Sequence, residues 1–212
     1  MSELARSSDA TQLLAPIDFY FDLGSPYAYL GSELIDTLGA RYRRQVNWHV
    51  FLLGAAFKHT GAAPLTQQAL KGSYALHDFA RSAGFHDIPF RQPTRFPVST
   101  VHAARAFCWL SAQDPLLARG FAHAIFRAYF TADRDIDNID TVLDIAQSQG
   151  VARSSLAEAL GSVALKDSLR LEVDRAIARG VFGAPFFILD GEAFWGVDRL
   201  PQLTRRLDGE AF

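Results

Sequence analysis

The chain has 212 residues, 49% hydrophobic and 21% charged, which predicts one folded domain with a real core and excludes global disorder. Its 21 basic and 23 acidic residues give a net charge of −2, so the basic excess of nucleic-acid-binding proteins is missing, and no apolar run could span a membrane. The single cysteine excludes an internal disulfide. Residues 1–16 lack the pattern of a secretory signal, so we expect a flexible leader on a cytoplasmic protein.

The first fifty residues predict a strand, a helix and a second strand. Residues 17–22 alternate apolar and polar side chains, as a half-buried strand does. Ser25 can cap a helix with Pro26 in its first position, and an apolar stripe continues towards Gly39. Residues 46–51 alternate again, which completes a βαβ unit.

The middle of the chain has helical spacing. Asp114, Asp137 or Asn138, and Gly180 stand where caps of these helices are expected. The loop 84–97 is rich in proline and aromatic residues, and we expect it to line or close a site. The predicted helices cover residues 70–83, 100–112, 115–131, 139–149 and 165–178.

The chain returns to strands near its end. Segments 186–189 and 192–195 flank an Asp-Gly pair, which predicts a tight hairpin. Asp198 can cap a closing helix that ends at Leu207. The expected order is therefore βαβ, about 100 helical residues, and ββα.

This order, together with local motifs, resembles the thioredoxin fold. Segment 24–31 opens the first helix, where thioredoxin-like oxidoreductases carry two cysteines, and this chain has Ser25 and Ala28. Segments 180–185 and 194–200 follow at the expected places. Nearly the whole chain resembles the 2-hydroxychromene-2-carboxylate isomerases and the kappa-class glutathione transferases, which are DsbA-like thioredoxin-fold proteins, and supporting matches occur at 52–58, 71–74 and 89–97.

The resemblance implies an α/β, thioredoxin-like fold with a large all-helical insertion. Residues 17–55 and 180–207 would form the thioredoxin-like domain, and residues 56–179 the helical insertion domain. It also implies glutathione as the cofactor and a homodimer as the assembly.

Ser25 is the expected catalytic residue, although its local pattern alone favours a plain helix cap. Without cysteines at 25 and 28, disulfide exchange is impossible there. A helix N-terminus still favours an anion. The thiolate of glutathione fits this position, with the Ser25 hydroxyl donating a hydrogen bond to its sulfur. No G-x-S-x-G motif supports a direct serine nucleophile.

The resemblance implies several further contacts with glutathione. Ala184 would precede a cis proline and pair with the cysteinyl segment like an added strand, although the pattern also fits a simple turn. Asp198 would hold the γ-glutamyl amine besides capping a helix. The chain departs from the family at Val197 and Ala62, which replace residues that hydrogen-bond. The implied glutathione-binding residues are Pro26, Tyr27, Ala184, Pro185, Trp195, Gly196, Val197 and Asp198.

The resemblance to the isomerases implies that Lys58 is the cation that binds a substrate carboxylate, and Arg95 is a second substrate-binding candidate. The alternative for Lys58 is a solvated lysine in a loop, and Lys71 and Arg91 are weaker candidates. The six histidines show no metal-ligand spacing, so we predict no metal site.

The resemblance implies a glutathione-dependent cis–trans isomerase in aromatic-compound degradation. It would interconvert 2-hydroxychromene-2-carboxylate and trans-o-hydroxybenzylidenepyruvate, so its partner is a small aromatic carboxylate. Two alternatives remain open: a kappa-like transferase that conjugates glutathione to electrophiles, and a non-catalytic thioredoxin-fold binding module. Cys108 is expected to be a core thiol without a part in the chemistry.

Overall fold

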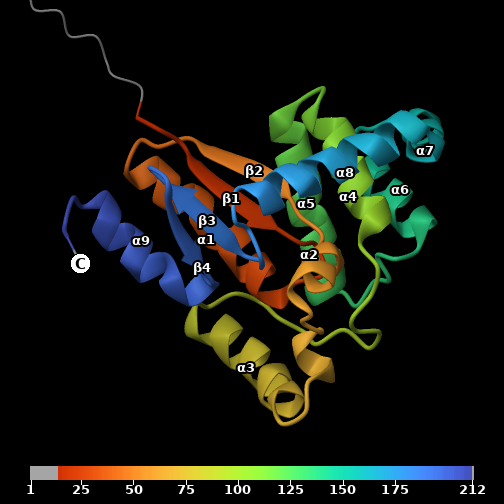
Figure 1. The fold of residues 1–212 in the computed structure, drawn as a ribbon. Coiled ribbons are helices and arrows are strands. Elements are labelled where there is room, and N and C mark those ends of the chain that lie inside the picture. The colour runs from red at the N-terminus through yellow and green to blue at the C-terminus, as the bar shows by residue number, and fades with distance from the viewer. Residues whose placement is uncertain (1–13, 212) are drawn as a thin grey trace, which may run out of the picture.

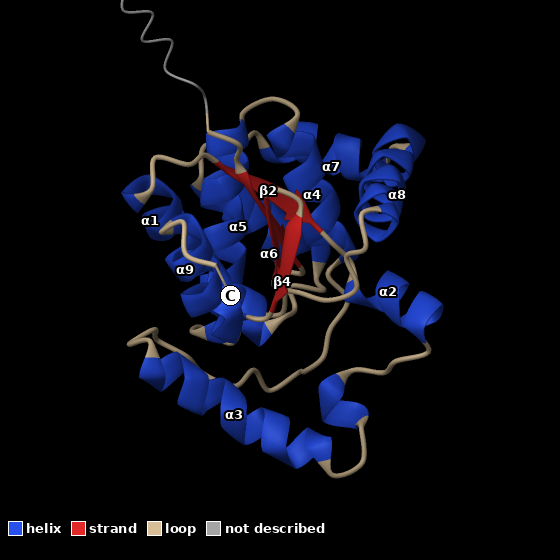
Figure 2. Cartoon of the chain, turned by 60° about the vertical axis from the view of Figure 1, so that its left-hand side comes forward, coloured by secondary structure: helices blue, strands red, loops and turns tan. Residues whose placement is uncertain are grey.

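A mixed four-stranded sheet with the order β2-β1-β3-β4 runs through the centre of the computed structural model, with helices on both sides (Figures 1 and 2). Strand β1 pairs in parallel with β2 and antiparallel with β3, and β3 forms an antiparallel hairpin with β4. The structure describes residues 14–211, so most of the expected leader lies outside it. The strands are β1 (Ile17–Phe21), β2 (Val46–Val50), β3 (Phe186–Leu189) and β4 (Glu192–Trp195).

The helices of the described residues follow the predicted order, with additions. They are α1 (Pro26–Arg41), α2 (Leu53–Thr60), α3 (Lys71–Phe85), α4 (Val101–Ser111), α5 (Pro115–Phe130), α6 (Ile139–Ser148), α7 (Arg153–Gly161), α8 (Val163–Ala178) and α9 (Leu200–Leu207), with the 3-10 turns η1 (Leu65–Gln67) and η2 (Val197–Arg199). The α/β thioredoxin-like fold with inserted helices is therefore confirmed. Helix α3 lies below the rest of the molecule in both views (Figures 1 and 2).

Side-chain caps mark several of the helix starts that the sequence predicted. The hydroxyl of Ser25 accepts from the N–H of Ala28 at the start of α1. The carboxylate of Asp114 caps α5, and Asn138, rather than Asp137, caps α6. Such caps satisfy N–H groups that the helix itself cannot pair.

Three expectations are corrected. The sequence pattern predicted neither α2 nor α7, and neither helix has a side-chain cap of its own. Lys58 was expected in a loop but lies in α2. Asp198 was expected to cap the last helix, but it lies in η2, and α9 begins after Arg199 without a side-chain cap.

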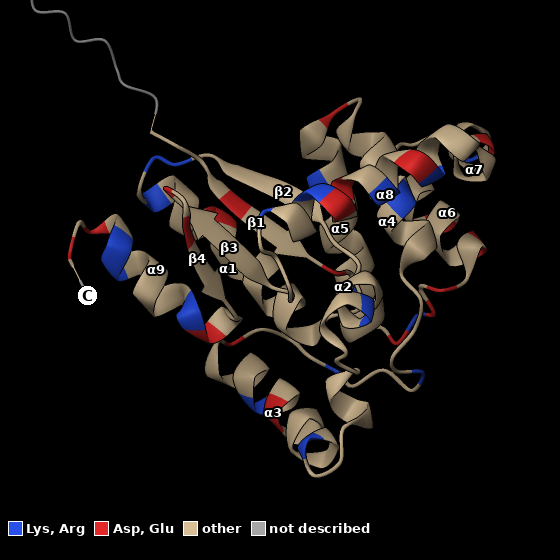
Figure 3. Ribbon diagram, viewed as in Figure 1, with Lys and Arg blue, Asp and Glu red and all other residues tan. Residues whose placement is uncertain are grey.

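The core is one connected cluster whose members come from the sheet and from the inserted helices. Aromatic rings fill the space beneath the sheet: Phe19 stacks on Phe187 at 5.3 Å between ring centroids, and Phe21 meets Phe107 edge-on at 5.0 Å. Acidic and basic residues are interspersed along the helices (Figure 3). Among the described residues, none of the helices could cross a membrane.

Candidate functional site

Ser25 lies at the N-terminus of α1, directly against the loop before β3. Its side chain is 4% exposed, and its hydroxyl donates to the carbonyl oxygen of Ala184 at 3.0 Å. The Ala184–Pro185 peptide bond is cis, as expected from the resemblance. The structure thus brings together two segments that are 159 residues apart in the chain.

Two backbone N–H groups near Ser25 remain without a hydrogen-bond partner in the described part of the chain. The N–H groups of Ala28 and Tyr29 donate to Ser25, and Pro26 has none, which leaves the N–H of Tyr27. The N–H of Ala184 is the second such group. Unpaired donors at a helix N-terminus create partial positive charge that favours an anion.

The segment after β4 is fastened to the cis proline. The N–H of Gly196 donates to the carbonyl oxygen of Pro185 at 3.0 Å. Gly196 has φ +106°, a conformation that favours glycine, and a Cβ at this position would meet the Asp198 carboxylate at 2.3 Å. The Trp195 ring covers Gly183 so closely that a Cβ there would lie 2.2 Å from its Nε1. These contacts hold the backbone just before Asp198 against the loop that contains the cis proline.

Asp198 presents its carboxylate to solvent, with 71% of the side chain exposed. Its nearest charged neighbour is Arg199 at 3.8 Å. The negative charge of Asp198 also reaches Tyr27, where it is one of the smaller causes of a raised phenol pKa, after burial and Asp78. Asp198 is therefore accessible to a cationic group, close to the first turn of α1. Val197 is buried and offers no side-chain hydrogen bond.

Asp22 is a buried carboxylate that the sequence pattern did not single out. It follows β1, is 6% exposed, and accepts from the N–H of Gly24 and the hydroxyl of Thr100, each at 2.9 Å, and from the N–H of Leu53 at 2.8 Å. Burial raises its pKa, and the three donors oppose that shift. The only sequence signal was a polar residue at the end of an apolar strand, directly before the site.

Tyr27 connects the site to α3. Its hydroxyl donates to Asp78 at 2.5 Å, and its ring packs edge-on against Phe79 at 5.1 Å between ring centroids. Burial and the Asp78 carboxylate raise the pKa of Tyr27. The first turn of α1 therefore holds α3 by one hydrogen bond and one aromatic contact.

The two expected substrate cations lie in different surroundings. Lys58 lies on α2, and no ion pair involves it in the described residues. Arg95 pairs with Asp135 and lies 3.8 Å from Asp137. Arg95 thus binds another loop of this chain, and the structure gives it no contact with Ser25.

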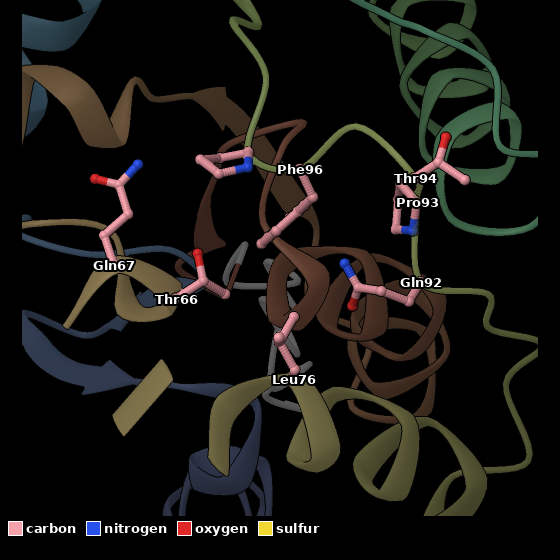
Figure 4. Close-up of a pocket in the computed structure, with 8 residues that line it drawn as sticks. Thr66, Gln67, Leu76, Gln92, Pro93, Thr94 and Phe96 are labelled. Atoms are coloured by element: carbon pink, nitrogen blue, oxygen red, sulfur yellow. The ribbon is translucent and has the colours of Figure 1, made fainter. Parts of the chain in front are cut away.

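A cavity of about 400 Å³ opens between α3 and the predicted loop (Figure 4). In this view Phe96 points between Thr66 and Gln92. The hydroxyl of Thr66 and Oε1 of Gln92 are buried without a partner among the described residues. The cavity size suits a small ligand. Its lining is uncharged and consists of Thr66, Gln67, Leu76, Gln92, Pro93, Thr94, Phe96 and Pro97.

Cys108 lies in α4, packed against the core. Burial raises the pKa of its thiol to about 12, so it stays protonated at neutral pH. A protonated, enclosed thiol is a poor nucleophile and cannot replace the cysteines that are missing at positions 25 and 28.

Comparisons with known proteins find relatives that align over most of this chain. The chain is 28% identical over 193 residues to a 2-hydroxychromene-2-carboxylate isomerase of Sphingobium xenophagum, covering 90% of this chain and 97% of that protein. It is 27% identical over 201 residues to glutathione S-transferase kappa 2 of Caenorhabditis elegans, covering 89% of each. A solved 2-hydroxychromene-2-carboxylate isomerase superposes with a TM-score of 0.80 at 25% identity, covering 91% of this chain and 94% of the other.

The DsbA-like thioredoxin domain matches residues 16–208, from the start of β1 to the end of α9. The similar proteins named above are isomerases and glutathione transferases, and they align over most of this chain. The chain is therefore a member of the DsbA-like thioredoxin domain family.

Proposed function

We propose that this protein is a glutathione-dependent isomerase that interconverts 2-hydroxychromene-2-carboxylate and trans-o-hydroxybenzylidenepyruvate. The observation that carries the proposal is the contact of Ser25 with the cis Ala184–Pro185 bond at the start of α1. Cysteines at positions 25 and 28 would allow thiol–disulfide exchange at the start of α1, but Ser25 and Ala28 cannot form a disulfide.

The described residues fit glutathione at three points. The N–H of Ala184 is free to pair with a peptide that lies beside it as an extra strand. The exposed Asp198 carboxylate can hold an ammonium group. The unpaired N–H of Tyr27 and the hydroxyl of Ser25 lie where a thiolate would be stabilised.

When bound, glutathione would supply a thiolate for reversible addition to the conjugated system of the ring-opened substrate, which would turn the double bond into a single bond that can rotate. The residues of the chain do the remaining work. Ser25 keeps the sulfur ionised, Asp198 orients the γ-glutamyl end, and Lys58 binds the substrate carboxylate. The uncharged cavity beside Phe96 suits the aromatic end of the substrate.

Isothermal titration with glutathione, followed by an absorbance assay on the chromene carboxylate, tests the proposal. We expect saturable binding of glutathione and isomerisation that depends on it, without net consumption of glutathione. Net consumption with electrophiles would instead favour the transferase suggested by the kappa relatives. A protein that does not bind glutathione would contradict both and favour a binding module. We take the active species to be a homodimer, which sedimentation velocity tests.

A further inference from the structure

The Asp22 carboxylate joins three segments that are distant in sequence. One oxygen accepts from the N–H of Gly24, in the turn before α1, and from the hydroxyl of Thr100, the residue before α4. The other oxygen accepts from the N–H of Leu53, the first residue of α2. A buried carboxylate is stable only when such donors replace its hydration. The Asp22 carboxylate is therefore a junction at which the starts of α1, α2 and α4 are hydrogen-bonded together.

Asp22 also supplies the cap that α2 lacks. The residue before this helix is Leu52, which has no polar side chain and makes no capping hydrogen bond. The N–H of Leu53 is one of the donors that a helix cannot satisfy internally, and Asp22 accepts it from 31 residues earlier in the chain. A carboxylate at a helix N-terminus also interacts favourably with the helix dipole.

Asp22 also contacts Ser25, the residue proposed to stabilise the thiolate. The N–H of Ser25 donates to the main-chain oxygen of Asp22 at 2.9 Å. Lys58 stands five residues after Leu53 on α2, about 7.5 Å further along the axis. One residue thus connects the start of α1, which carries Ser25, to the helix that carries Lys58.

We propose that Asp22 is a positioning residue. It caps α2 from a distant part of the chain and thereby holds Lys58 in a fixed position relative to Ser25. This role rests on the proposed function, because it matters when the substrate carboxylate and the reacting carbon are engaged together. A displacement of about 1 Å at a reacting centre can cost about a hundredfold in rate.

A double-mutant cycle between Asp22 and Lys58 separates positioning from general stability. We expect Asp22→Asn to lower kcat/KM for the chromene carboxylate about tenfold when Lys58 is present, and less than twofold in the Lys58→Ala background. The same fold-loss in both backgrounds would overturn the proposal. Asp114→Asn is the matched control, because it removes a carboxylate that caps α5, and it should leave kcat/KM unchanged.

Thr100 gives a milder variant in case Asp22→Asn folds poorly. Thr100→Val removes one of the three donors, and we expect a smaller loss of kcat/KM that again depends on Lys58. Thr100→Ser keeps the hydroxyl and should restore the wild-type value. A loss with Thr100→Ser equal to that with Thr100→Val would contradict a role for this hydrogen bond.

Amide hydrogen exchange tests the junction without any catalysis. In Asp22→Asn and Thr100→Val, we expect the amides of α2 to exchange faster while those of α5 keep their wild-type rates. Unchanged exchange in α2 would overturn the proposal. If Lys58→Ala leaves kcat/KM unchanged, or if no isomerisation occurs, the proposed function is contradicted. The hydrogen-exchange rates of α2 still decide, independently of catalysis, whether Asp22 caps this helix.

Discussion

The Ser25 hydroxyl has one proton to donate, and in this structure the Ala184 carbonyl accepts it. Stabilising a thiolate requires this hydroxyl to rotate from Ala184 to the sulfur. A hydrogen bond to an ion contributes about 1.5–3 kcal/mol and a neutral one about 0.5–1.5 kcal/mol, so the exchange favours the ion. Ser25 can therefore act both as a helix cap, through its lone pairs, and as a donor to sulfur.

Asp198 is expected to matter for glutathione affinity. Asp198→Asn removes the charge that would hold the γ-glutamyl ammonium, and at this exposed position we expect the KM for glutathione to rise about fivefold, equivalent to about 1 kcal/mol. The kcat should change little. Steady-state kinetics with glutathione as the varied substrate checks this, with Asp190→Asn as a control for an exposed aspartate elsewhere. An unchanged KM would remove Asp198 from the binding site.

Cys108 is expected to be silent in the reaction. Because burial raises the pKa of its thiol to about 12, alkylation at neutral pH should be much slower than for free cysteine. Cys108→Ser should keep glutathione-dependent activity within about twofold if the fold is intact. Thiol alkylation followed by mass spectrometry, with parallel rate assays, tests this. A large activity loss at unchanged stability would show that the sulfur chemistry involves this residue.

At the scale of single elements, Tyr27 is expected to hold α3 in place. Tyr27→Phe keeps the contact with Phe79 but removes the hydrogen bond to Asp78, which should cost about 1 kcal/mol. Amide exchange should accelerate in α3. Tyr42→Phe is the matched control, because it removes an exposed tyrosine–aspartate hydrogen bond at the other end of α1. Equal exchange of α3 in both variants would contradict this role of Tyr27.

Local side-chain caps help to predict where some helices begin, and the start of α2 has no such local signal. The residues before α1, α5 and α6 carry side-chain oxygens that mark their starts. Helix α2 is short, and its cap comes from Asp22, 31 residues away in the chain, so no local pattern reveals it. For this reason the local sequence pattern predicts a loop at Lys58, where the structure has a helix.

The same distinction holds for the site. The resemblance implies that Ser25 and Ala184 both contact glutathione, so their proximity could be anticipated, whereas the hydrogen bond between them could not. The junction at Asp22 could not, because its donors Leu53 and Thr100 come from separate parts of the chain, and the residue itself reads as the end of a strand. Hydrogen bonds between distant segments leave no periodic signal.

At the scale of the whole molecule, stability should fall in acid through partly buried ion pairs. Burial alone would raise the pKa of Asp18, but hydrogen bonds from His49, Arg179 and Asn47 outweigh it and lower the pKa to about 2. A lowered pKa stabilises the fold above the ordinary value near 4, and this contribution is lost as the pH falls towards 2. Glu33 behaves likewise, with a pKa of about 2.

Denaturant titrations between pH 6 and pH 2 measure this contribution. We expect the free energy of unfolding to decline below about pH 4, and Asp18→Asn to flatten part of the decline. Asp167 forms an exposed ion pair with Arg170, so Asp167→Asn should leave the pH dependence of the free energy of unfolding as it is in the wild-type protein. If Asp18→Asn shows the full wild-type slope, the network around this carboxylate does not stabilise the fold.

The pKa of the glutathione thiol bound to this protein tests the central claim most directly. The absorbance of the thiolate, titrated against pH, should give a pKa about one to two units below the free value of about 8.5. Ser25→Ala should return part of that shift, while Ser32→Ala, at a buried serine about two turns further along α1, should not. A bound thiol that titrates like free glutathione, or equally in all three proteins, would contradict thiolate stabilisation at Ser25.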